Sequence, residues 1–254
     1  MVTLPKTPSF RLDGKRALIT GAGRGIGLAA AAALADAGAH VTLSARTKSE
    51  IDEAADAIRA RGQKADTLAF DVTDDAAMQA ALKGKIFDIL VNNAGMNQPG
   101  PFIETKPEVY DKIFDLDMRA AYFVAQAMVR ELVAAKKPGS IINMTSQMGH
   151  VGWAGRTIYV AAKHALEGFT KALAVELAPI GIRVNALAPT FIETPMTAAS
   201  FENPAFKKAV LDKIKLGRLG QVEDLMGAIV FLASDASALM TGTSLVIDGG
   251  WTAE

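Results

Sequence analysis

Short apolar runs alternate with longer amphipathic stretches along the 254 residues of the chain. The apolar runs are nearly continuous, which is typical of strands that are buried on both faces of a parallel sheet. We predict seven strands, at 16–20, 40–44, 65–70, 87–91, 139–145, 182–188 and 244–248.

The stretches between these runs have helical periodicity. Strand–helix alternation implies right-handed crossovers, and it predicts an α/β fold with a doubly wound, Rossmann-like parallel sheet. Because no linker rich in small residues or proline divides the chain, we expect one domain over 1–254, with a loose leader at 1–11. We predict helices at 25–37, 48–61, 74–82, 107–135, 157–178 and 221–233.

The stretch 189–220 departs from this rhythm, because three prolines interrupt it before a short amphipathic piece. In doubly wound sheets, ligands bind outside the carboxyl ends of the strands, and long excursions there are often functional. We therefore expect a short helical substrate lid near 190–215.

Composition and charge narrow the class of protein. Half of the residues are hydrophobic and 21% are charged, as in an ordinary soluble protein. The 27 basic residues balance the 27 acidic ones, so no net field attracts nucleic acid or a membrane surface. With no apolar run of signal-peptide or membrane-span length, we expect a cytoplasmic protein with neither nucleic acid nor membrane as partner. The absence of cysteine excludes disulfides, thiolate zinc sites and a cysteine nucleophile.

The segment TGAGRGIG (20–27) lies between the first predicted strand and the first predicted helix. Missing side chains let a pyrophosphate approach the backbone, and the helix N-terminus offers free N–H groups to it. Glycine also serves tight turns for steric reasons alone, but a strand before and a helix after favour nucleotide binding. The predicted cofactor-binding residues of this loop are Gly21, Arg24, Gly25, Ile26 and Gly27.

The end of the second strand bears on which nucleotide binds. An acidic residue there would bind the ribose 2′-hydroxyl of NAD, whereas this chain has Arg46, with Arg24 in the glycine loop. Two guanidinium groups suit a 2′-phosphate, so we predict NADP(H), with NAD(H) possible. Two solvated surface arginines are the alternative. Asp71 and Val72 would lie beside the adenine, unless Asp71 simply caps the next helix.

Tyr159 and Lys163 are four residues apart and share one face of a predicted helix. That spacing is also common in helices that bury the tyrosine and solvate the lysine. Ser146 favours a catalytic role for this pair, because the end of the strand before Ser146 and the start of this helix meet at the edge of the sheet where the glycine loop lies. A phenol of pKa about 10 is a poor base at neutral pH, but a neighbouring ammonium favours the phenolate.

These three residues predict acid–base chemistry on a carbonyl or alcohol. Ser146 would hold the substrate oxygen while Tyr159 exchanges the proton, and Lys163 would also reach the nicotinamide ribose. His150 and His164 are expected to be bystanders. No carboxylate–histidine spacing indicates a metal site or a hydrolase triad, so we expect no metal.

Five motifs in this order resemble the short-chain dehydrogenase/reductase family, from about Leu12 to Trp251. They are TGAGRGIG, NNAG (92–95), the Ser146, Tyr159 and Lys163 trio, VNALAPTFIETPM (184–196) and FLASDASALMTGTSLVIDGGW (231–251). The resemblance implies a hydride transfer with a nicotinamide cofactor. It also implies cofactor contacts by Asn93, Ala94, Gly95, Pro189, Ile192 and Thr194, the last two at the nicotinamide carboxamide.

The chain departs from the family pattern at two positions. Asp117 stands where the family usually has an asparagine that kinks the helix and frees a carbonyl for a relay water near the lysine. An anion there would act on Lys163, so we include Asp117 among the catalytic candidates. Thr190 replaces the usual glycine after Pro189, and we expect a different turn, because threonine disfavours positive φ.

The resemblance also implies a homo-oligomer, a tetramer or dimer packed through the helices at 107–135 and 157–178. Their alanine-rich faces fit such packing, although packing within one chain explains them almost as well. The loops around the predicted pocket are mainly apolar, with His150, Arg156 and Glu193 as their few charges. We expect a small-molecule substrate, a sugar, polyol or small keto compound. The alternatives are a 3-oxoacyl thioester and a non-catalytic NADP(H)-binding sensor or scaffold.

Overall fold

The computed structural model describes residues 2–253, and its centre is one seven-stranded parallel sheet. The strand order is β3-β2-β1-β4-β5-β6-β7, so the chain runs outward from β1 and then returns to the other side of it at β4. This confirms the doubly wound α/β prediction. The strands are β1 (Arg16–Thr20), β2 (His40–Ala45), β3 (Ala65–Ala69), β4 (Ile89–Asn92), β5 (Gly139–Met144), β6 (Ile182–Pro189) and β7 (Ser244–Ile247).

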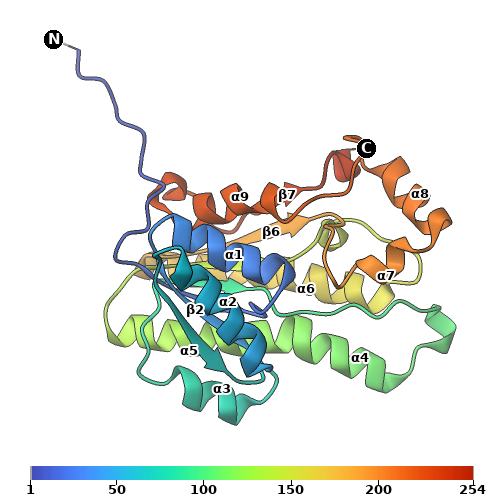
Figure 1. Cartoon of the computed structure of the whole chain (residues 1–254), viewed down its shortest axis with the longest axis horizontal. Coiled ribbons are helices and arrows are strands. Elements are labelled where there is room, and N and C mark those ends of the chain that lie inside the picture. The colour runs from blue at the N-terminus through green and yellow to red at the C-terminus, as the bar shows by residue number, and fades with distance from the viewer. Residues whose placement is uncertain (1, 254) are drawn as a thin grey trace.

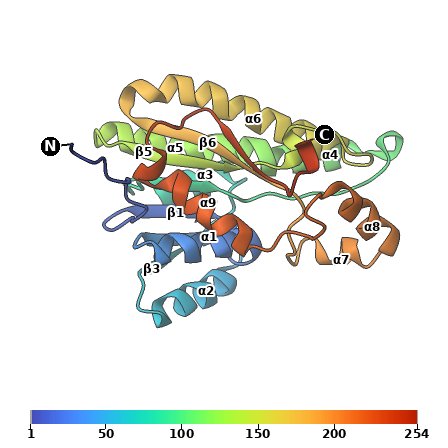
Figure 2. The same cartoon turned by 90° about the horizontal axis from the view of Figure 1, so that it is seen from above.

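Helices cover both faces of the sheet (Figures 1 and 2). On β1, Ala17 and Ile19 join the core beneath α1, α2 and α9, while Leu18 points to the opposite core, beneath α3, α5 and α6. This alternation gives each strand two buried faces, which is why the strands read as continuous apolar runs. The helices are α1 (Gly25–Asp36), α2 (Lys48–Ala60), α3 (Asp75–Leu82), α4 (Pro107–Phe114), α5 (Ala120–Ala134), α6 (Thr157–Leu177), α7 (Ala198–Phe201), α8 (Pro204–Lys213) and α9 (Glu223–Ala233).

The helix predicted at 107–135 is not a single α-helix. A π-helical turn, Asp115–Arg119, separates α4 from α5. A π turn inserts one extra residue into the helical register and is frequently found at functional sites. This one carries Asp117 and turns its side chain into the protein, where it is 1% exposed.

The stretch after β6 holds the two short helices α7 and α8, which project beyond the sheet in Figure 2. Val210 of α8 packs with Met148, Phe191 and Trp251 in a separate apolar cluster, so this segment has its own small core. Residues 2–11 form neither helix nor strand and are exposed. None of the helices described over 2–253 has the length and apolarity needed to cross a bilayer.

Candidate active site

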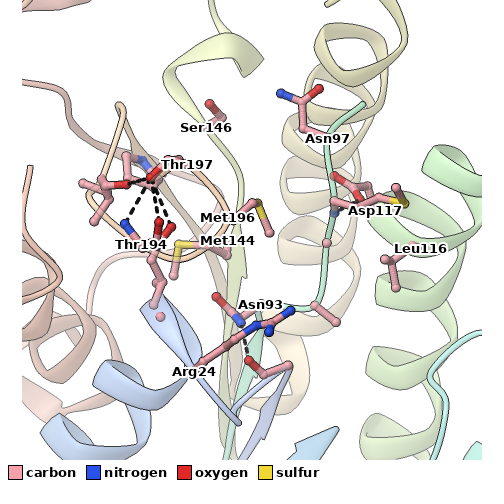
Figure 3. A pocket seen from close by; sticks show the side chains of 18 of the residues that line it. Arg24, Asn93, Asn97, Leu116, Asp117, Met144, Ser146, Thr194, Met196 and Thr197 are labelled. Atoms are coloured by element: carbon pink, nitrogen blue, oxygen red, sulfur yellow. Dashed lines mark hydrogen bonds between the residues drawn. The ribbon is translucent and has the colours of Figure 1, made fainter. Parts of the chain in front are cut away.

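A cavity of about 380 Å³ opens at the carboxyl ends of the strands, where the glycine loop, the ends of β2, β4, β5 and β6, and helix α6 meet. Arg24 and Asn93 lie at one end of it, and Ser146 and Asn97 lie toward the other (Figure 3). Of the residues predicted as site residues, all but Gly27 line this cavity: Gly21, Arg24, Gly25, Ile26, Arg46, Asp71, Val72, Asn93, Ala94, Gly95, Asp117, Ser146, Tyr159, Lys163, Pro189, Ile192 and Thr194.

The glycine loop needs its glycines for two different reasons. Gly21 and Gly25 have φ of +64° and +57°, a left-handed conformation that side chains disfavour. Gly27 does not line the cavity, but a Cβ there would lie 2.3 Å from the Gly21 carbonyl oxygen, so Gly27 lets α1 pack onto the loop. The α1 N-cap, Arg24, makes no side-chain capping bond within residues 2–253. The first N–H groups of α1 therefore face a glycine-lined space, which fits a pyrophosphate.

The two arginines predicted to bind a 2′-phosphate lie at the same end of the cavity. Arg24 Nη1 is 3.8 Å from Glu50 Oε1, and Arg46 Nη1 is 3.8 Å from Asp71 Oδ2. Both guanidinium groups are more than two-thirds exposed. Long, solvated ion pairs of this kind are weak, so an added anion can compete for either arginine.

Asp71 does not cap helix α3. Its Oδ1 accepts hydrogen bonds from the Thr73 amide and hydroxyl, whereas Asp74 Oδ1 accepts from the Ala77 amide at 3.0 Å and forms the cap. The capping alternative for Asp71 is therefore wrong. The aspartate remains at the cavity, beside Arg46.

The segment after β4 is tied to the glycine loop. Asn93 Nδ2 donates to the carbonyl oxygens of Thr20 and Gly21, at 2.9 and 3.2 Å. The amides of Asn93 and Ala94 both donate to Thr20 Oγ1. The NNAG motif thus holds the segment after β4 against the glycine loop, and both segments line the cavity.

Ser146, Tyr159 and Lys163 come together as predicted from their positions. Ser146 follows β5, and its Oγ donates to Gln147 Oε1 at 2.7 Å and accepts from the Met148 amide at 3.1 Å. Lys163 Nζ donates to the Met144 carbonyl at 3.1 Å and lies 5.3 Å from the centroid of the Tyr159 ring. The ammonium is thus held near the phenol by the backbone of β5.

Asp117 forms a buried ion pair with Lys163. Its Oδ2 is 3.2 Å from Lys163 Nζ, and its Oδ1 accepts from the Met96 amide at 2.7 Å. Burial raises the pKa of Asp117, although Lys163 opposes that shift. Burial by itself disfavours the Lys163 ammonium, but the charges of Asp117 and Tyr159 outweigh it and raise the pKa of Lys163. The lysine is thus held in its charged form.

Of the charged residues expected in the loops around the substrate, only Arg156 lines the cavity. His150 Nε2 instead lies 3.0 Å from Ser244 Oγ and 3.3 Å from Glu167 Oε1, and Glu193 accepts a hydrogen bond from Gln221. His164 Nδ1 lies 2.9 Å from the Val160 carbonyl oxygen, away from the site. The two histidines are outside the cavity lining.

Three polar residues of the cavity were not among the predicted site residues, although Thr190 had been singled out as a departure from the family pattern. Asn97 Oδ1, Gln147 Nε2 and Thr190 Oγ1 line it, are buried and have no hydrogen-bond partner within the described chain. For Gln147, the available signal was its position directly after Ser146. Thr190 avoids positive φ, and its amide donates to the Ile247 carbonyl at 3.1 Å. No three histidine or acidic residues among those described are grouped as a metal site would require.

Comparisons with known proteins identify the family of the chain. A short-chain dehydrogenase/reductase family model, described as enoyl-(acyl carrier protein) reductase, matches residues 21–252. The chain belongs to the short-chain dehydrogenase/reductase family. It is thus an oxidoreductase that acts on CH–OH groups.

Family members with different substrates are similar over nearly the whole chain. L-xylulose reductase of Bos taurus is 41% identical over 96% of this chain and 99% of its own length. 3-Oxoacyl-[acyl-carrier-protein] reductase of Pseudomonas aeruginosa is 40% identical over 94% and 98%. A gluconate 5-dehydrogenase of Burkholderia cenocepacia, solved with NADP and tartrate, has a TM-score of 0.93 at 38% identity over 96% and 98%.

Proposed function

We propose that this chain interconverts a secondary alcohol and a ketone on a sugar or polyol, with NADP(H) as cofactor. The observation that carries the proposal is the position of Lys163 Nζ, which is fixed by the Met144 carbonyl and by Asp117 beside the Tyr159 ring. Within a family of CH–OH oxidoreductases, a phenol and a buried ammonium at the cavity provide the proton transfer that the reaction needs.

The residues present fit a nicotinamide dinucleotide. The uncapped start of α1 and the left-handed glycines suit a pyrophosphate, and Arg24 and Arg46 suit a 2′-phosphate. A bound NADP⁺ would supply the acceptor for the hydride of the carbinol carbon, so that alcohol and NADP⁺ would give ketone, NADPH and a proton. Within the remaining predicted set, we assign cofactor contacts to Asp71, Val72, Asn93, Ala94, Gly95, Pro189, Ile192 and Thr194.

The chain's own side chains handle the proton. Tyr159 accepts the hydroxyl proton during oxidation and returns it during reduction. Lys163 stabilises the phenolate and binds the ribose hydroxyls, and Ser146 holds the reacting oxygen. Ser146 donates to Gln147 in the structure, so substrate binding must redirect this hydroxyl bond.

The sugar or polyol class is supported by the similarity to L-xylulose reductase and by three buried polar atoms without partners in the cavity, which fit hydroxyl groups. The 3-oxoacyl thioester alternative is supported by the similarity to the Pseudomonas reductase. An acyl carrier needs basic residues near the cavity mouth, but Arg119 is not among the residues that line the cavity, and its guanidinium is paired with Asp75. This observation favours the sugar or polyol class.

The same proposal extends to assembly and location. We infer one domain that forms a homo-oligomer through α4, α5 and α6, because Tyr110, Tyr122, Val133 and Val175 expose apolar side chains on these helices. We infer a cytoplasmic location.

A substrate panel tests the proposal. The chain is incubated with NADP⁺ and polyols or sugar acids, or with NADPH and ketoses or a 3-oxoacyl thioester, and NADPH absorbance is followed. Turnover of a polyol, sugar acid or ketose is expected. Efficient turnover of the thioester alone would move the assignment to the alternative, and cofactor binding without any turnover would favour a sensor.

A further inference from the structure

Arg156 is a largely buried cation that has no aspartate or glutamate partner among the described residues. It is 7% exposed, lines the cavity and forms the N-cap of α6, three residues before Tyr159. Its side chain makes no hydrogen bond and no ion pair within the described chain. The guanidinium carbon lies 5.7 Å from the centroid of the Phe206 ring, and the charge of Arg156 also interacts with Tyr159.

The other charged residues of the interior each have an ion-pair or hydrogen-bond partner. Asp117 and Lys163 pair with each other, and Asp248 accepts bonds from Gly250 and Thr252. The half-buried Arg183 donates to Ser237 and to three backbone carbonyls. A buried charge is costly unless it is paired, so the isolation of Arg156 requires an explanation.

An aromatic ring does not explain it. A ring face attracts a cation but accepts none of the five in-plane N–H donors of a guanidinium. Those donors match the two oxygens of a carboxylate in a bidentate arrangement. Arg156 also stands at the N-terminus of a 21-residue helix, where the backbone dipole adds to the attraction for an anion.

The position of Arg156 indicates that the anion is a group of the substrate. Arg156 and Tyr159 line the same cavity, and the charge of Arg156 interacts with Tyr159, so an anion bound to Arg156 would share the cavity with the oxygen that Tyr159 serves. The two groups therefore belong to one small molecule. Asn97 Oδ1, Gln147 Nε2 and Thr190 Oγ1 offer partnerless polar atoms in the same cavity.

We propose that Arg156 is a specificity-determining residue that binds the carboxylate of a short polyhydroxy or keto acid. The inference rests on the proposed oxidoreductase function and narrows its substrate class. The partnerless polar atoms bind the hydroxyl groups of the same molecule, and the cluster of Phe191, Phe206 and Trp251 excludes water from the ion pair.

Two matched ligand pairs isolate the carboxylate. D-gluconate and D-glucitol differ only at C1, which is a carboxylate in one and CH₂OH in the other, and kcat/KM with NADP⁺ is measured for each. Tartrate and threitol of the same configuration differ likewise at both ends, and their binding to the NADP⁺-loaded protein is measured by calorimetry. The carboxylate is expected to be preferred by at least about tenfold, the size of one charge-assisted hydrogen bond.

Variants assign that preference to Arg156. Arg156→Gln should abolish the carboxylate-to-neutral ratio, and Arg156→Lys should restore part of it. Arg61→Gln, which removes an exposed guanidinium outside the cavity lining, should leave the ratio unchanged. Equal treatment of carboxylate and neutral ligands, failure to bind either carboxylate, or a preference that survives Arg156→Gln would overturn the inference.

The two proposals fail in different ways. Turnover of neutral polyols without a carboxylate preference removes the role of Arg156 but keeps the oxidoreductase assignment. Tartrate binding that depends on Arg156, without turnover of any substrate, would keep the role of Arg156 and remove the oxidoreductase assignment. A second measurement tests whether Arg156 lacks structural bonds. Arg156→Met should not lower the thermal midpoint of the cofactor-free chain, whereas Arg183→Met should, because Arg183 donates several hydrogen bonds. Equal lowering would mean that Arg156 is held by structural bonds.

Discussion

Replacing Asp117 with asparagine tests whether the buried carboxylate sets the pH at which the site works. The change removes one charge and keeps an oxygen that can accept from the Met96 amide. Lys163 Nζ lies 3.2 Å from Asp117 Oδ2 and 5.3 Å from the Tyr159 centroid. The carboxylate oxygen is therefore no farther from the ring than the sum of these distances, about 8.5 Å.

At that separation and an effective dielectric constant of about 20, a carboxylate opposes a phenolate by about 2 kcal/mol. This energy corresponds to about 1.4 pH units. Removing the carboxylate favours the phenolate, so the pH of half-maximal alcohol oxidation should fall by about one unit or more in Asp117→Asn. The assay is kcat/KM for alcohol oxidation between pH 6 and 10, followed by NADPH absorbance.

Asp115→Asn is the matched control, because it makes the same chemical change in the same π turn at an exposed position, where solvent screens the charge. Its profile should match that of the parent chain. Superimposable profiles for Asp117→Asn and the parent would refute the reasoning, since they would mean that Asp117 is already neutral over this range. Thermal unfolding of each variant shows whether the fold is retained.

Three further predictions concern the proton, the cofactor and stability. Tyr159→Phe should lower kcat by about 10²–10⁴-fold, and parent-level turnover would exclude the phenol as acid–base group. Arg46→Asp should raise the KM for NADP⁺ by at least about tenfold without a matching rise for NAD⁺; parallel changes would contradict a 2′-phosphate contact. Asp224 accepts two bonds from Arg218 and one from the Gln221 amide, which lower its pKa to about 2. The contribution of the Asp224 carboxylate to the free energy of unfolding is therefore present above pH 4 and lost as the pH falls toward 2. Asp224→Asn should lower the free energy of unfolding, measured with urea, by about 1 kcal/mol at pH 7 and by progressively less below pH 4.

The fold and most of the cavity could be predicted because their signals are local. Continuous apolar runs indicate strands buried on both faces, and the glycine loop can be recognised because it lies between a predicted strand and a predicted helix. The interpretation of Asp71 was harder, because both Asp71 and Asp74 precede the same helix. Only the start of α3 at Asp75 makes Asp74 its cap.

Other features depend on what the fold brings together. The π turn arises inside a stretch whose periodicity is helical throughout, so the sequence predicted one helix there. The isolation of Arg156 is likewise invisible in sequence, since it depends on the absence of an acidic neighbour among all the described elements around it. His150 and Glu193 belong to loops near the cavity, but neither side chain lines it. The side chain of His150 contacts Ser244 and Glu167, and that of Glu193 accepts a hydrogen bond from Gln221.

The charges of the cavity form a consistent arrangement. At one end, Arg24 and Arg46 are loosely paired with Glu50 and Asp71, which also line the cavity. The Asp117–Lys163 pair leaves the centre close to neutral, whereas Arg156 adds a positive charge near Tyr159. A lone Lys163 would stabilise the phenolate strongly, and Asp117 reduces that stabilisation. Arg156, whose charge interacts with Tyr159, partly compensates. A carboxylate bound to Arg156 would cancel that compensation, so acidic and neutral substrates should be oxidised with different pH dependence, the acid requiring the higher pH. The pH profile thus depends on what occupies the substrate end as well as on the residues that carry out the proton transfer.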